Sequence, residues 1–481
     1  MTEWSMASSG AGAGLEVSAR LDRIPVASRS HRVWAGLLCA VFLFELADLN
    51  TFTYVAPALR EHWGATVEGI GFVTSAAFLG MFVGALVGGR LADALGRRWA
   101  LIGSALCYSL FSLLSALSPN MAVLGVMRVL TGVGLESLTV IGLIYISEMF
   151  PARIRGRHQA LILGIGLVGI PMMSWFARLV VPTGPQGWRW VFVLGGVGIV
   201  AAFAMIRLLP ESVRWLEAHG RRDRAAELVA GLEDEARHLT GGELPAVGTA
   251  PPPEEPGRLG ELFVGRFRRR TLVLSGAWVF SILGFYGFNA WVPTLLVERG
   301  FTVVQSLTYA AILSIGAVPG ALLAWPVIDR WERKYALLVI DVVIGALVLV
   351  YGFVANLPII LVSGILVTLL LQMQTAFIYT YTPEVFPTRL RGVGTGFTNG
   401  LGRLAGTGGG ALVAALVQAW GHQSVSGYVA VCMVAAGVLV AVFGVRTTGR
   451  PLATISARPA PVGKRPTEER LAGRPGVRRE P

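Results

Sequence analysis

Long apolar blocks recur along this chain and are separated by short polar stretches. Each block is close to the ~20 residues that a helix needs to cross a hydrocarbon core ~30 Å thick. The pattern therefore predicts an all-α integral membrane protein. Its twelve spans are expected near 34–58, 68–89, 99–118, 122–148, 158–181, 187–209, 271–297, 305–327, 335–356, 358–380, 393–419 and 424–446.

The overall composition agrees with a membrane protein. Of its 481 residues, 54% are hydrophobic and only 15% are charged, whereas soluble domains carry about 25% charged residues. The net charge of +12 is also found in nucleic-acid-binding proteins. Here the arginines lie in short loops between apolar blocks, so no nucleic-acid partner is expected.

The distribution of basic residues among the loops predicts the orientation. Alternation of the spans puts both chain ends and the central loop on one side. The short loops on that side carry Arg90, Arg97, Arg98, Arg153, Arg155, Arg157, Arg330, Arg333, Lys334, Arg389 and Arg391. The opposite loops carry only Arg60, Arg178, Arg189 and Arg299. The richer side is predicted to be cytoplasmic, which places the protein in the inner membrane with both termini inside.

We expect five regions along the chain. They are a cytoplasmic N-terminal segment (1–30), a six-helix bundle (31–209), a central cytoplasmic loop (210–270), a second six-helix bundle (271–446) and a cytoplasmic tail (447–481). The two terminal regions are rich in Arg, Pro, Ser and Gly and are predicted to be disordered. No cleavable signal peptide is expected, because the first region has no apolar stretch.

Two stretches of the central loop differ in character. HGRRDRAAELVAGLEDEARH (219–238) predicts a surface helix, and PAVGTAPPPEEPG (245–257) predicts a proline-rich linker.

An internal repeat relates the two halves of the chain. GRLADALGRRWAL (89–101) is echoed by WPVIDRWERKYAL (325–337), and EMFPARIRG (148–156) by EVFPTRLRG (384–392). Asp93 corresponds to Asp329, 236 residues later, and Glu148 corresponds to Glu384 with the same offset. Two separate segments that share one offset indicate duplication of a six-span unit. Transporters are commonly built from such repeats, with the solute site at the repeat interface.

The first repeated loop is similar to the signature between the second and third helices of the major facilitator superfamily. Its key positions are filled by Gly89, Asp93, Gly96, Arg97 and Arg98. MRVLTGVG (127–134) also resembles the fourth-helix motif of this family. The resemblance implies two pseudo-symmetric six-helix bundles and transport by alternating access.

Further segments resemble particular branches of the family. ELADLNTFTYVAPAL (45–59), RLDRIPV (20–26), WVPTLL (291–296) and GRLAG (402–406) look like aromatic-acid and other organic-acid:proton symporters. PESVRWL (210–216) looks like the end of the sixth helix in sugar porters and metabolite symporters.

The repeated loops are predicted to form a cytoplasmic gate. The Asp93 carboxylate is expected to cap a helix N-terminus and to pair with arginines of a neighbouring loop. In the second copy Glu332 replaces Gly96, so a weaker latch is expected there. The candidate gate residues are Gly89, Asp93, Gly96, Arg97, Arg98, Glu148, Arg155, Asp329, Arg330, Arg333, Glu384 and Arg391.

Charged residues inside the spans are the candidates for chemistry, because each costs about 2.5–3.5 kcal/mol at the bilayer centre on insertion scales. Glu45 and Asp48 lie one turn apart on one face of the first span. Arg128 lies in the fourth span and Arg403 in the eleventh. These charges have no counterpart at the 236-residue offset, which favours a functional role over a need of the fold.

These charges suggest a proton symporter. Glu45 or Asp48 is the expected protonation site, and Arg403 is expected to bind a substrate carboxylate through a bidentate contact. Arg128 either pairs with the ionised carboxylates during transport or forms a static salt bridge that orders the first bundle. Glu136 is either a second titrating group or the structural partner of a buried amide or hydroxyl.

Polar and aromatic residues of the second bundle are further candidates for substrate contact. They are Asn289, Tyr286 and Trp291 in the seventh span and Gln372, Gln374 and Tyr379 in the tenth. Binding sites of this kind are mostly apolar with a few convergent polar groups. Packing or a place in the interfacial aromatic belt is the alternative role for single aromatic residues.

No cofactor or metal is expected. Cys39, Cys107 and Cys432 lie inside apolar blocks and have no ligand spacing. No histidine falls in mid-span and no nucleophile motif is present, so a membrane enzyme is not expected. The expected partners are protons, a small solute and the lipid bilayer, with a monomer as the working unit.

The predicted function is proton-coupled uptake of a small organic anion, such as an aromatic or sugar-derived carboxylate. An export antiporter is less favoured, because GIGLVGIP (164–171) lacks the paired glycines of the export signature. A neutral sugar or polyol porter is supported by PESVRWL, but Arg403 and the acidic first span favour an anion. A non-transporting receptor on a carrier fold would leave the membrane charges without a use.

Overall fold

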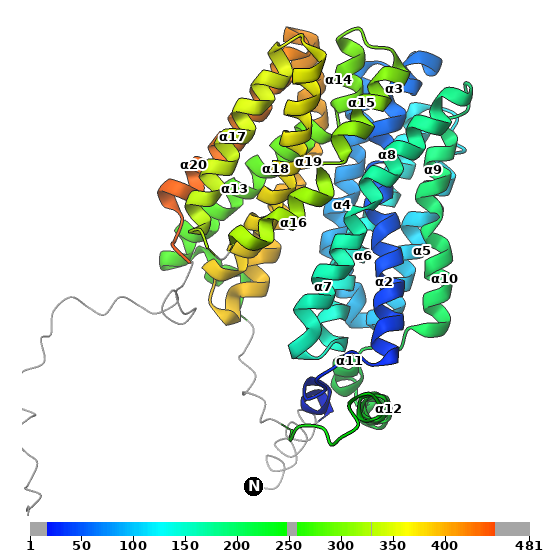
Figure 1. Ribbon diagram of the computed structural model, residues 1–481, viewed down its shortest axis with the longest axis vertical. Coiled ribbons are helices and arrows are strands. Elements are labelled where there is room, and N and C mark those ends of the chain that lie inside the picture. The colour runs from blue at the N-terminus through cyan, green and yellow to red at the C-terminus, as the bar shows by residue number, and fades with distance from the viewer. Residues whose placement is uncertain (1–16, 248–256, 329, 448–481) are drawn as a thin grey trace, which may run out of the picture.

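The computed structural model describes residues 17–247, 257–328 and 330–447 (Figure 1). Within these residues, twelve helical segments are long and apolar enough to cross a membrane, as predicted. The predicted positions 1–16, 248–256, Asp329 and 448–481 lie outside the described residues, including most of the tail and of the proline-rich linker.

Two bundles stand side by side and are joined by a central segment (Figure 1). The first contains α2 (Arg29–Leu49), α3 (Thr51–Trp63), α4 (Val67–Leu95), α5 (Arg97–Ser115), α6 (Met121–Met149), α7 (Ala152–Leu167), α8 (Gly169–Val180), η1 (Val181–Thr183), α9 (Arg189–Gly196) and α10 (Gly198–Leu208). The central segment contains α11 (Val213–Ala218), α12 (Arg222–Thr240) and η2 (Leu259–Phe263). The second bundle contains α13 (Gly265–Asn289), α14 (Val292–Glu298), α15 (Val303–Ser314), α16 (Ala317–Ile328), α17 (Arg333–Phe353), α18 (Leu357–Val385), α19 (Thr388–Trp420) and α20 (Gln423–Phe443).

The two bundles approach each other most closely at the end that carries α3 and α14, which we call the α3 end. There α14 packs on α3, and α15 packs on α8. Helices α4 and α19 also pack together, with Gly71 against Gly410. Toward the opposite end, which carries α11 and α12 and is called the α12 end, the ribbons of the two bundles diverge (Figure 1).

The duplication is visible in the packing. Gly80 of α4 lies directly against the backbone of Val129 on α6, and Gly316, which directly precedes α16, lies in the same way against Ile365 on α18. Both residues of the second contact follow those of the first by 236 positions. One turn further on, the same relation holds for Gly84 on Val133 and Gly320 on Leu369. Small residues allow such close approach of membrane helices, so each half has kept the same helix-to-helix contact.

We expect Gly80→Ala to destabilise the folded protein by about 1–3 kcal/mol, because the added Cβ would collide with the Val129 carbonyl. Gly36→Ala is the matched control, since its Cβ would meet no atom within 4 Å. Thermal unfolding in detergent, followed by size-exclusion chromatography, measures the difference. Equal melting temperatures for the two variants would show that the α4–α6 contact is loose.

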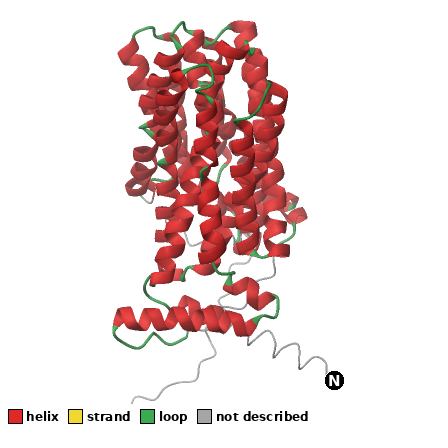
Figure 2. Cartoon of the chain, turned by 90° about the vertical axis from the view of Figure 1, so that its right-hand side faces the viewer, coloured by secondary structure: helices red, strands yellow, loops and turns green. Residues whose placement is uncertain are grey.

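Helix α12 lies at the end of the first bundle, at a large angle to the membrane spans (Figure 1, Figure 2). It occupies the stretch in which a surface helix was predicted, and its buried face includes Val229 and Leu232. The prediction of disorder for 1–30 is wrong for residues 17–30. Residues 17–22 are helical, and Leu21 and Ile24 are buried in the same cluster as α12.

Ion pairs and a hydrogen bond connect this N-terminal segment to α12 and to α7. Arg20 and Arg23 contact the Glu233 carboxylate at 2.8 and 2.7 Å. Burial by itself raises the pKa of Glu233, but the hydrogen bonds and charges of these arginines outweigh burial and hold the pKa below its ordinary value. Asp22 accepts a hydrogen bond from the Ala152 backbone amide at 2.9 Å, at the beginning of α7. The composition of the segment gave no sign of these long-range partners.

Candidate functional site

Five buried charged residues gather in the body of the two bundles. They are Glu45 and Asp48 on α2, Arg128 and Glu136 on α6, and Arg403 on α19, and each is at most 8% exposed. Buried charges need partners, and the structure resolves these residues into two ion pairs and one hydrogen-bonded carboxyl group. These are the residues on which the sequence placed the proton and substrate chemistry.

The first ion pair lies entirely within the first bundle. Arg128 Nη1 lies 3.2 Å from Asp48 Oδ2, and the two side chains are 2% and 0% exposed. The other carboxylate oxygen of Asp48 accepts a hydrogen bond from Ser112 of α5. The guanidinium also lies over the Phe192 ring, 5.7 Å from its centroid. Both oxygens of Asp48 are therefore satisfied by neighbours in the same bundle.

A break in the first span contributes to this pair. Helix α2 ends at Leu49 and α3 begins at Thr51, with Asn50 between them. The Asp48 carbonyl accepts hydrogen bonds from Thr51 Oγ1 at 2.8 Å and from Arg128 Nη2 at 3.3 Å. Arg128 thus binds both the side chain and the main chain of Asp48 at the break.

The second ion pair joins the two bundles. Arg403 Nη2 of α19 lies 3.4 Å from Glu136 Oε2 of α6, and the side chains are 10% and 7% exposed. The partner of Glu136 is thus a guanidinium, whereas the structural alternative from the sequence was an amide or hydroxyl. Among the ion pairs between described residues, this one and Arg60–Glu298 at the α3 end cross between the bundles.

Aromatic groups surround the Arg403 guanidinium. Its Nη1 donates to the Tyr286 hydroxyl at 3.2 Å. The Tyr286 ring packs edge-to-face on Phe78 of α4, with centroids 4.5 Å apart. Arg403 Nε is buried and has no hydrogen-bond partner among the described residues. The bundle interface therefore contains the Arg403 cation, whose Nε has no partner among the described residues, and the rings of Tyr286 and Phe78.

Glu45 is held separately from both pairs. Thr139 of α6 donates a hydrogen bond to its carboxyl group at 2.7 Å. The charges of Glu136, Arg403 and Asp48 all act on Glu45. The first span therefore carries one carboxylate in an ion pair and one that is hydrogen-bonded to a hydroxyl.

The other predicted contact residues are divided. Gln374 donates to Ser281 at 2.8 Å, and Asn399 donates to the Tyr379 hydroxyl at 3.1 Å. Tyr379 also packs edge-to-face on Trp278. These polar groups come from α13, α18 and α19, as does the Arg403–Tyr286 contact. Gln372 is buried on the same helix as Gln374.

Asn289 and Trp291 are placed differently. The Asn289 amide donates to the Phe285 carbonyl of its own helix at 3.1 Å. Trp291 is 1% exposed and precedes α14, which packs on α3 and α15. Their surroundings in the described chain are those of packing residues.

Sequence reasoning missed Ser112, Thr139, Phe78 and Asn399. Hydroxyls, amides and single aromatic residues are frequent in membrane spans, so their types alone carried no signal. Ser112 and Thr139 are distinguished by their hydrogen bonds to buried carboxyl groups, and Phe78 and Asn399 by their contacts with Tyr286 and Tyr379.

The predicted gate residues form matching ion pairs at the α12 end. Arg97 contacts Glu148 at 3.0 Å in the first bundle, and Arg333 contacts Glu384 at 3.3 Å in the second. Each residue of the second pair follows its counterpart by 236 positions. Each pair ties the ends of two helices within one bundle.

Asp93 does not cap a helix N-terminus in this structure. Its side chain is 74% exposed and pairs with Arg97, four residues further on. Glu211 instead accepts a hydrogen bond from the Arg98 amide at 3.0 Å, at the beginning of α5. Glu211 also lies against Gly96, where an added Cβ would strike its carboxylate. A carboxylate beyond the loop therefore caps this helix.

The remaining gate residues take varied places. Arg155 and Arg391, again 236 apart, each bind a backbone carbonyl of their own bundle, Phe150 at 3.0 Å and Pro383 at 3.2 Å. Arg98 donates to the Ile206 carbonyl. Gly89 has open space beside it, and Arg330 is exposed.

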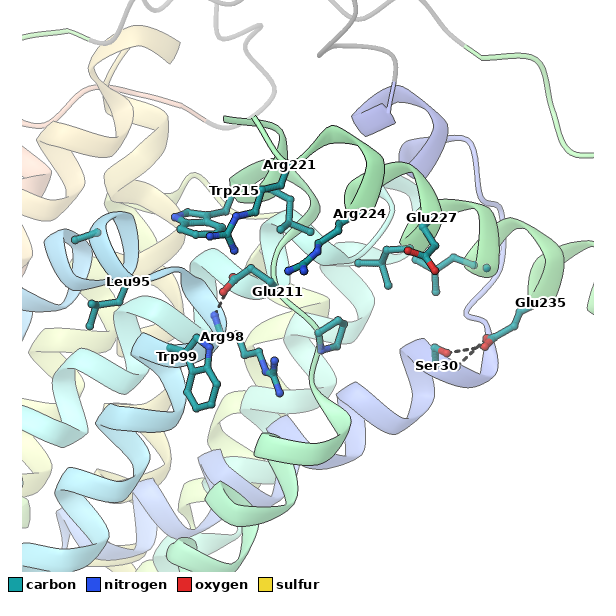
Figure 3. A pocket seen from close by; sticks show the side chains of 16 residues that line it. Ser30, Leu95, Arg98, Trp99, Glu211, Trp215, Arg221, Arg224, Glu227 and Glu235 are labelled. Atoms are coloured by element: carbon teal, nitrogen blue, oxygen red, sulfur yellow. Dashed lines mark hydrogen bonds between the residues drawn. The ribbon is translucent and has the colours of Figure 1, made fainter. Parts of the chain in front are cut away.

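A cavity of about 910 Å³ lies beneath α12, beside the α4–α5 turn (Figure 3). Its lining carries equal numbers of arginines and glutamates, namely Arg98, Arg221, Arg224, Glu211, Glu227 and Glu235. None of the five buried charges lines it. We therefore place the candidate site at Arg403 and Glu136, between the bundles.

Comparisons with known proteins agree with this architecture. The family model of the Major Facilitator Superfamily matches residues 37–409 and, in a second match, residues 311–478. A candidate metabolite transport protein of Bacillus subtilis (strain 168), YyaJ, is 38% identical over 437 residues, covering 90% of this chain and 96% of that protein. The niacin transporter NiaP of Acinetobacter baylyi is 29% identical over 447 residues, covering 92% of this chain and 100% of NiaP.

The solved structures support the same fold. The xylose transporter XylE of E. coli, in a partially occluded inward-open conformation, aligns with a TM-score of 0.69 at 16% identity, covering 87% of this chain and 98% of XylE. The family expected from the loop motifs is therefore confirmed. The family model and the relatives show that this protein is a transporter and not an enzyme, and the twelve candidate spans among the described residues agree with a multi-pass membrane protein. The chain belongs to the Major Facilitator Superfamily.

Proposed function

We propose that this chain is a proton-coupled symporter that takes up a small organic anion. Aromatic carboxylates are the class of anion that we favour as its substrate. The observation that carries the proposal is the Arg403 guanidinium, which is buried between the bundles beside aromatic rings. Transporter sites commonly lie at the interface of the two repeats. A buried arginine in this place is suited to a planar anion.

The anion is favoured by the chemistry around Arg403. A guanidinium binds a carboxylate through two parallel hydrogen bonds, and a neutral sugar offers no charge to match it. The edge-to-face rings of Tyr286 and Phe78 provide an apolar, aromatic wall next to the cation. Niacin, the substrate in the name of the Acinetobacter relative, is itself an aromatic carboxylate.

Proton coupling is supported by the buried carboxylates. Glu45, Asp48 and Glu136 lie within the spans, and no histidine of the described chain lies in the middle of one. Carboxylates that change their protonation are a common device for proton relay within membranes. We assign the coupling ion to H⁺ on this basis.

Alternating access is supported by the uneven contact between bundles. At the α3 end, Arg60 pairs with Glu298 and Arg178 donates to Thr308, each across the interface. At the α12 end the predicted gate pairs stay within single bundles. The basic loops are expected to face the cytoplasm. An arrangement that is closed at the α3 end and open at the α12 end is therefore inward-facing, and both termini lie on the cytoplasmic side.

Uptake into proteoliposomes tests the proposal. With an inside-alkaline pH gradient, we expect accumulation of labelled nicotinate or benzoate that a protonophore abolishes. Gluconate and hexoses serve as sugar-acid and neutral-sugar comparisons. Strict preference for hexoses would contradict the anion assignment, and accumulation that survives the protonophore would contradict proton coupling. Substrate loss driven by inward proton flow would identify an export antiporter.

A further inference from the structure

We propose that Glu136 is the residue through which proton and substrate are coupled, because it occupies the guanidinium edge of Arg403 that a substrate carboxylate needs. Substrate binds there only when Glu136 carries a proton and has released Arg403. This inference rests on the proposed function and assigns the coupling to one of its three buried carboxylates. The sequence analysis placed the main proton site at Glu45 or Asp48 and left Glu136 as either a second titrating group or a structural partner.

The atoms around Arg403 carry the first step. A bidentate carboxylate binds a guanidinium at Nε and the adjacent Nη2, through two parallel hydrogen bonds. Nε is buried and has no partner among the described residues. Nη2 faces Glu136 at 3.4 Å, which is longer than the 2.7–2.9 Å of a charge-assisted hydrogen bond. Tyr286 occupies Nη1, away from this edge. On this edge of the guanidinium, Nε therefore has no partner among the described residues, and Nη2 has only a long contact with Glu136.

Electrostatics make the two anions exclusive. A substrate carboxylate at this edge would lie beside an ionised Glu136, with one guanidinium shared between two buried negative charges. Like charges that share a buried site disfavour double ionisation. Protonation of Glu136 removes its charge and frees Nη2, so the incoming anion replaces it as the partner of Arg403. One proton is thus taken up for each anion bound.

The surroundings of Glu136 add few other charges. Its titratable neighbours are Arg403 on α19, Tyr286 on α13 and Glu45 on α2. Tyr108 faces this region from α5. Helix α4 has no titratable residue between Glu68 and Arg90, and α7 has none after His158. Within the described part of the chain, Arg403 is the cation that acts on Glu136 and that can exchange it for another anion.

The position of each pair in the fold separates Glu136 from Asp48. Glu136 and Arg403 belong to different bundles, so a rocking motion of the bundles changes their separation. Asp48 and Arg128 belong to the same bundle, and both Asp48 oxygens already have partners there. The first pair is placed to open and close during transport, whereas the second can persist through the cycle.

Calorimetry on the intact wild-type protein provides the first test. Nicotinate is titrated into purified transporter at mildly alkaline pH, in two buffers of different ionisation enthalpy. We expect uptake of about one proton per anion bound, because binding requires protonation of an ionised Glu136. Nicotinate affinity should also fall by up to about tenfold per pH unit as pH rises. Benzoate is the second probe.

Four variants identify the carboxylate responsible. In Glu136→Gln, we expect nicotinate to bind without proton uptake and with an affinity that does not change with pH. This variant should still exchange nicotinate across the membrane but should no longer accumulate it. Glu45→Gln and Asp48→Asn are the matched controls and should retain proton uptake on binding. Asp341, the other carboxylate buried within a described span, is removed in the same way by Asp341→Asn. If Glu136→Gln fails to fold, proton uptake that persists in Glu45→Gln, Asp48→Asn and Asp341→Asn still leaves Glu136 as the responsible carboxylate.

The outcomes separate this inference from the proposed function. Proton uptake that persists in Glu136→Gln but disappears in Asp48→Asn or Glu45→Gln would overturn the role of Glu136 and leave proton symport intact. Binding of nicotinate by wild type with no proton uptake at any pH would overturn both. Binding of hexoses with no response to nicotinate or benzoate would also overturn both, because Arg403 would then have no anion to exchange.

Discussion

Replacement of Arg403 by alanine is expected to lower the initial rate of aromatic carboxylate uptake by at least about 100-fold. Loss of one member of a buried, hydrogen-bonded charge pair costs about 2–5 kcal/mol of binding free energy. The fold-change of 100 corresponds to about 2.7 kcal/mol. Uptake of labelled nicotinate into proteoliposomes, normalised to the amount of inserted protein, measures the effect.

Two further variants identify the cause of that loss. Arg403→Lys keeps the positive charge but removes the planar edge with two donors, and we expect uptake to remain at least about tenfold below wild type. Arg403→Ala combined with Glu136→Gln removes the unpaired Glu136 charge, and uptake should not recover. Recovery in the double variant would show that Arg403 serves only to neutralise Glu136. Wild-type uptake by Arg403→Lys would show that charge alone is needed.

The second large effect is expected on stability, at the ion pair inside the first bundle. Arg128→Leu leaves the Asp48 carboxylate buried without its cation, which typically costs about 3–5 kcal/mol. Removal of both charges by Asp48→Leu and Arg128→Leu together should recover most of this loss, since replacement of a whole buried pair by apolar groups is often neutral. Thermal unfolding of the single and double variants in detergent measures both changes.

This comparison also decides the role of the pair. A static Asp48–Arg128 bridge predicts that the charge-free double variant is stable and still takes up a proton on binding nicotinate. A double variant that folds but no longer takes up protons would assign the coupling to Asp48. A stable Arg128→Leu single variant would contradict the energetic importance of the bridge altogether.

The sequence by itself determined the architecture of this protein. Twelve apolar blocks predicted twelve spans because the hydrocarbon core imposes a length on every crossing helix. The common offset of the loop motifs predicted the duplication, and the structure shows it in the ion pairs Arg97–Glu148 and Arg333–Glu384. Such features are local or repeated, so a pattern along the chain is enough to recognise them. The five charges at the candidate site were recognised for a similar reason, since charge is costly anywhere in a span.

Only the tertiary structure decided which of these charges meet. The spacing of Glu45 and Asp48 predicted a shared helix face. The ion pair between Asp48 and Arg128 depends instead on the helix break at Asn50 and on the packing of α6 against α2. The pairing of Glu136 with Arg403 arises where the two bundles pack together. In the same way, Glu211 took the capping role expected of Asp93. These contacts depend on how helices that are distant in the sequence pack together. The sequence pattern shows that a charge within a span is costly, but it does not identify the residue that pairs with it.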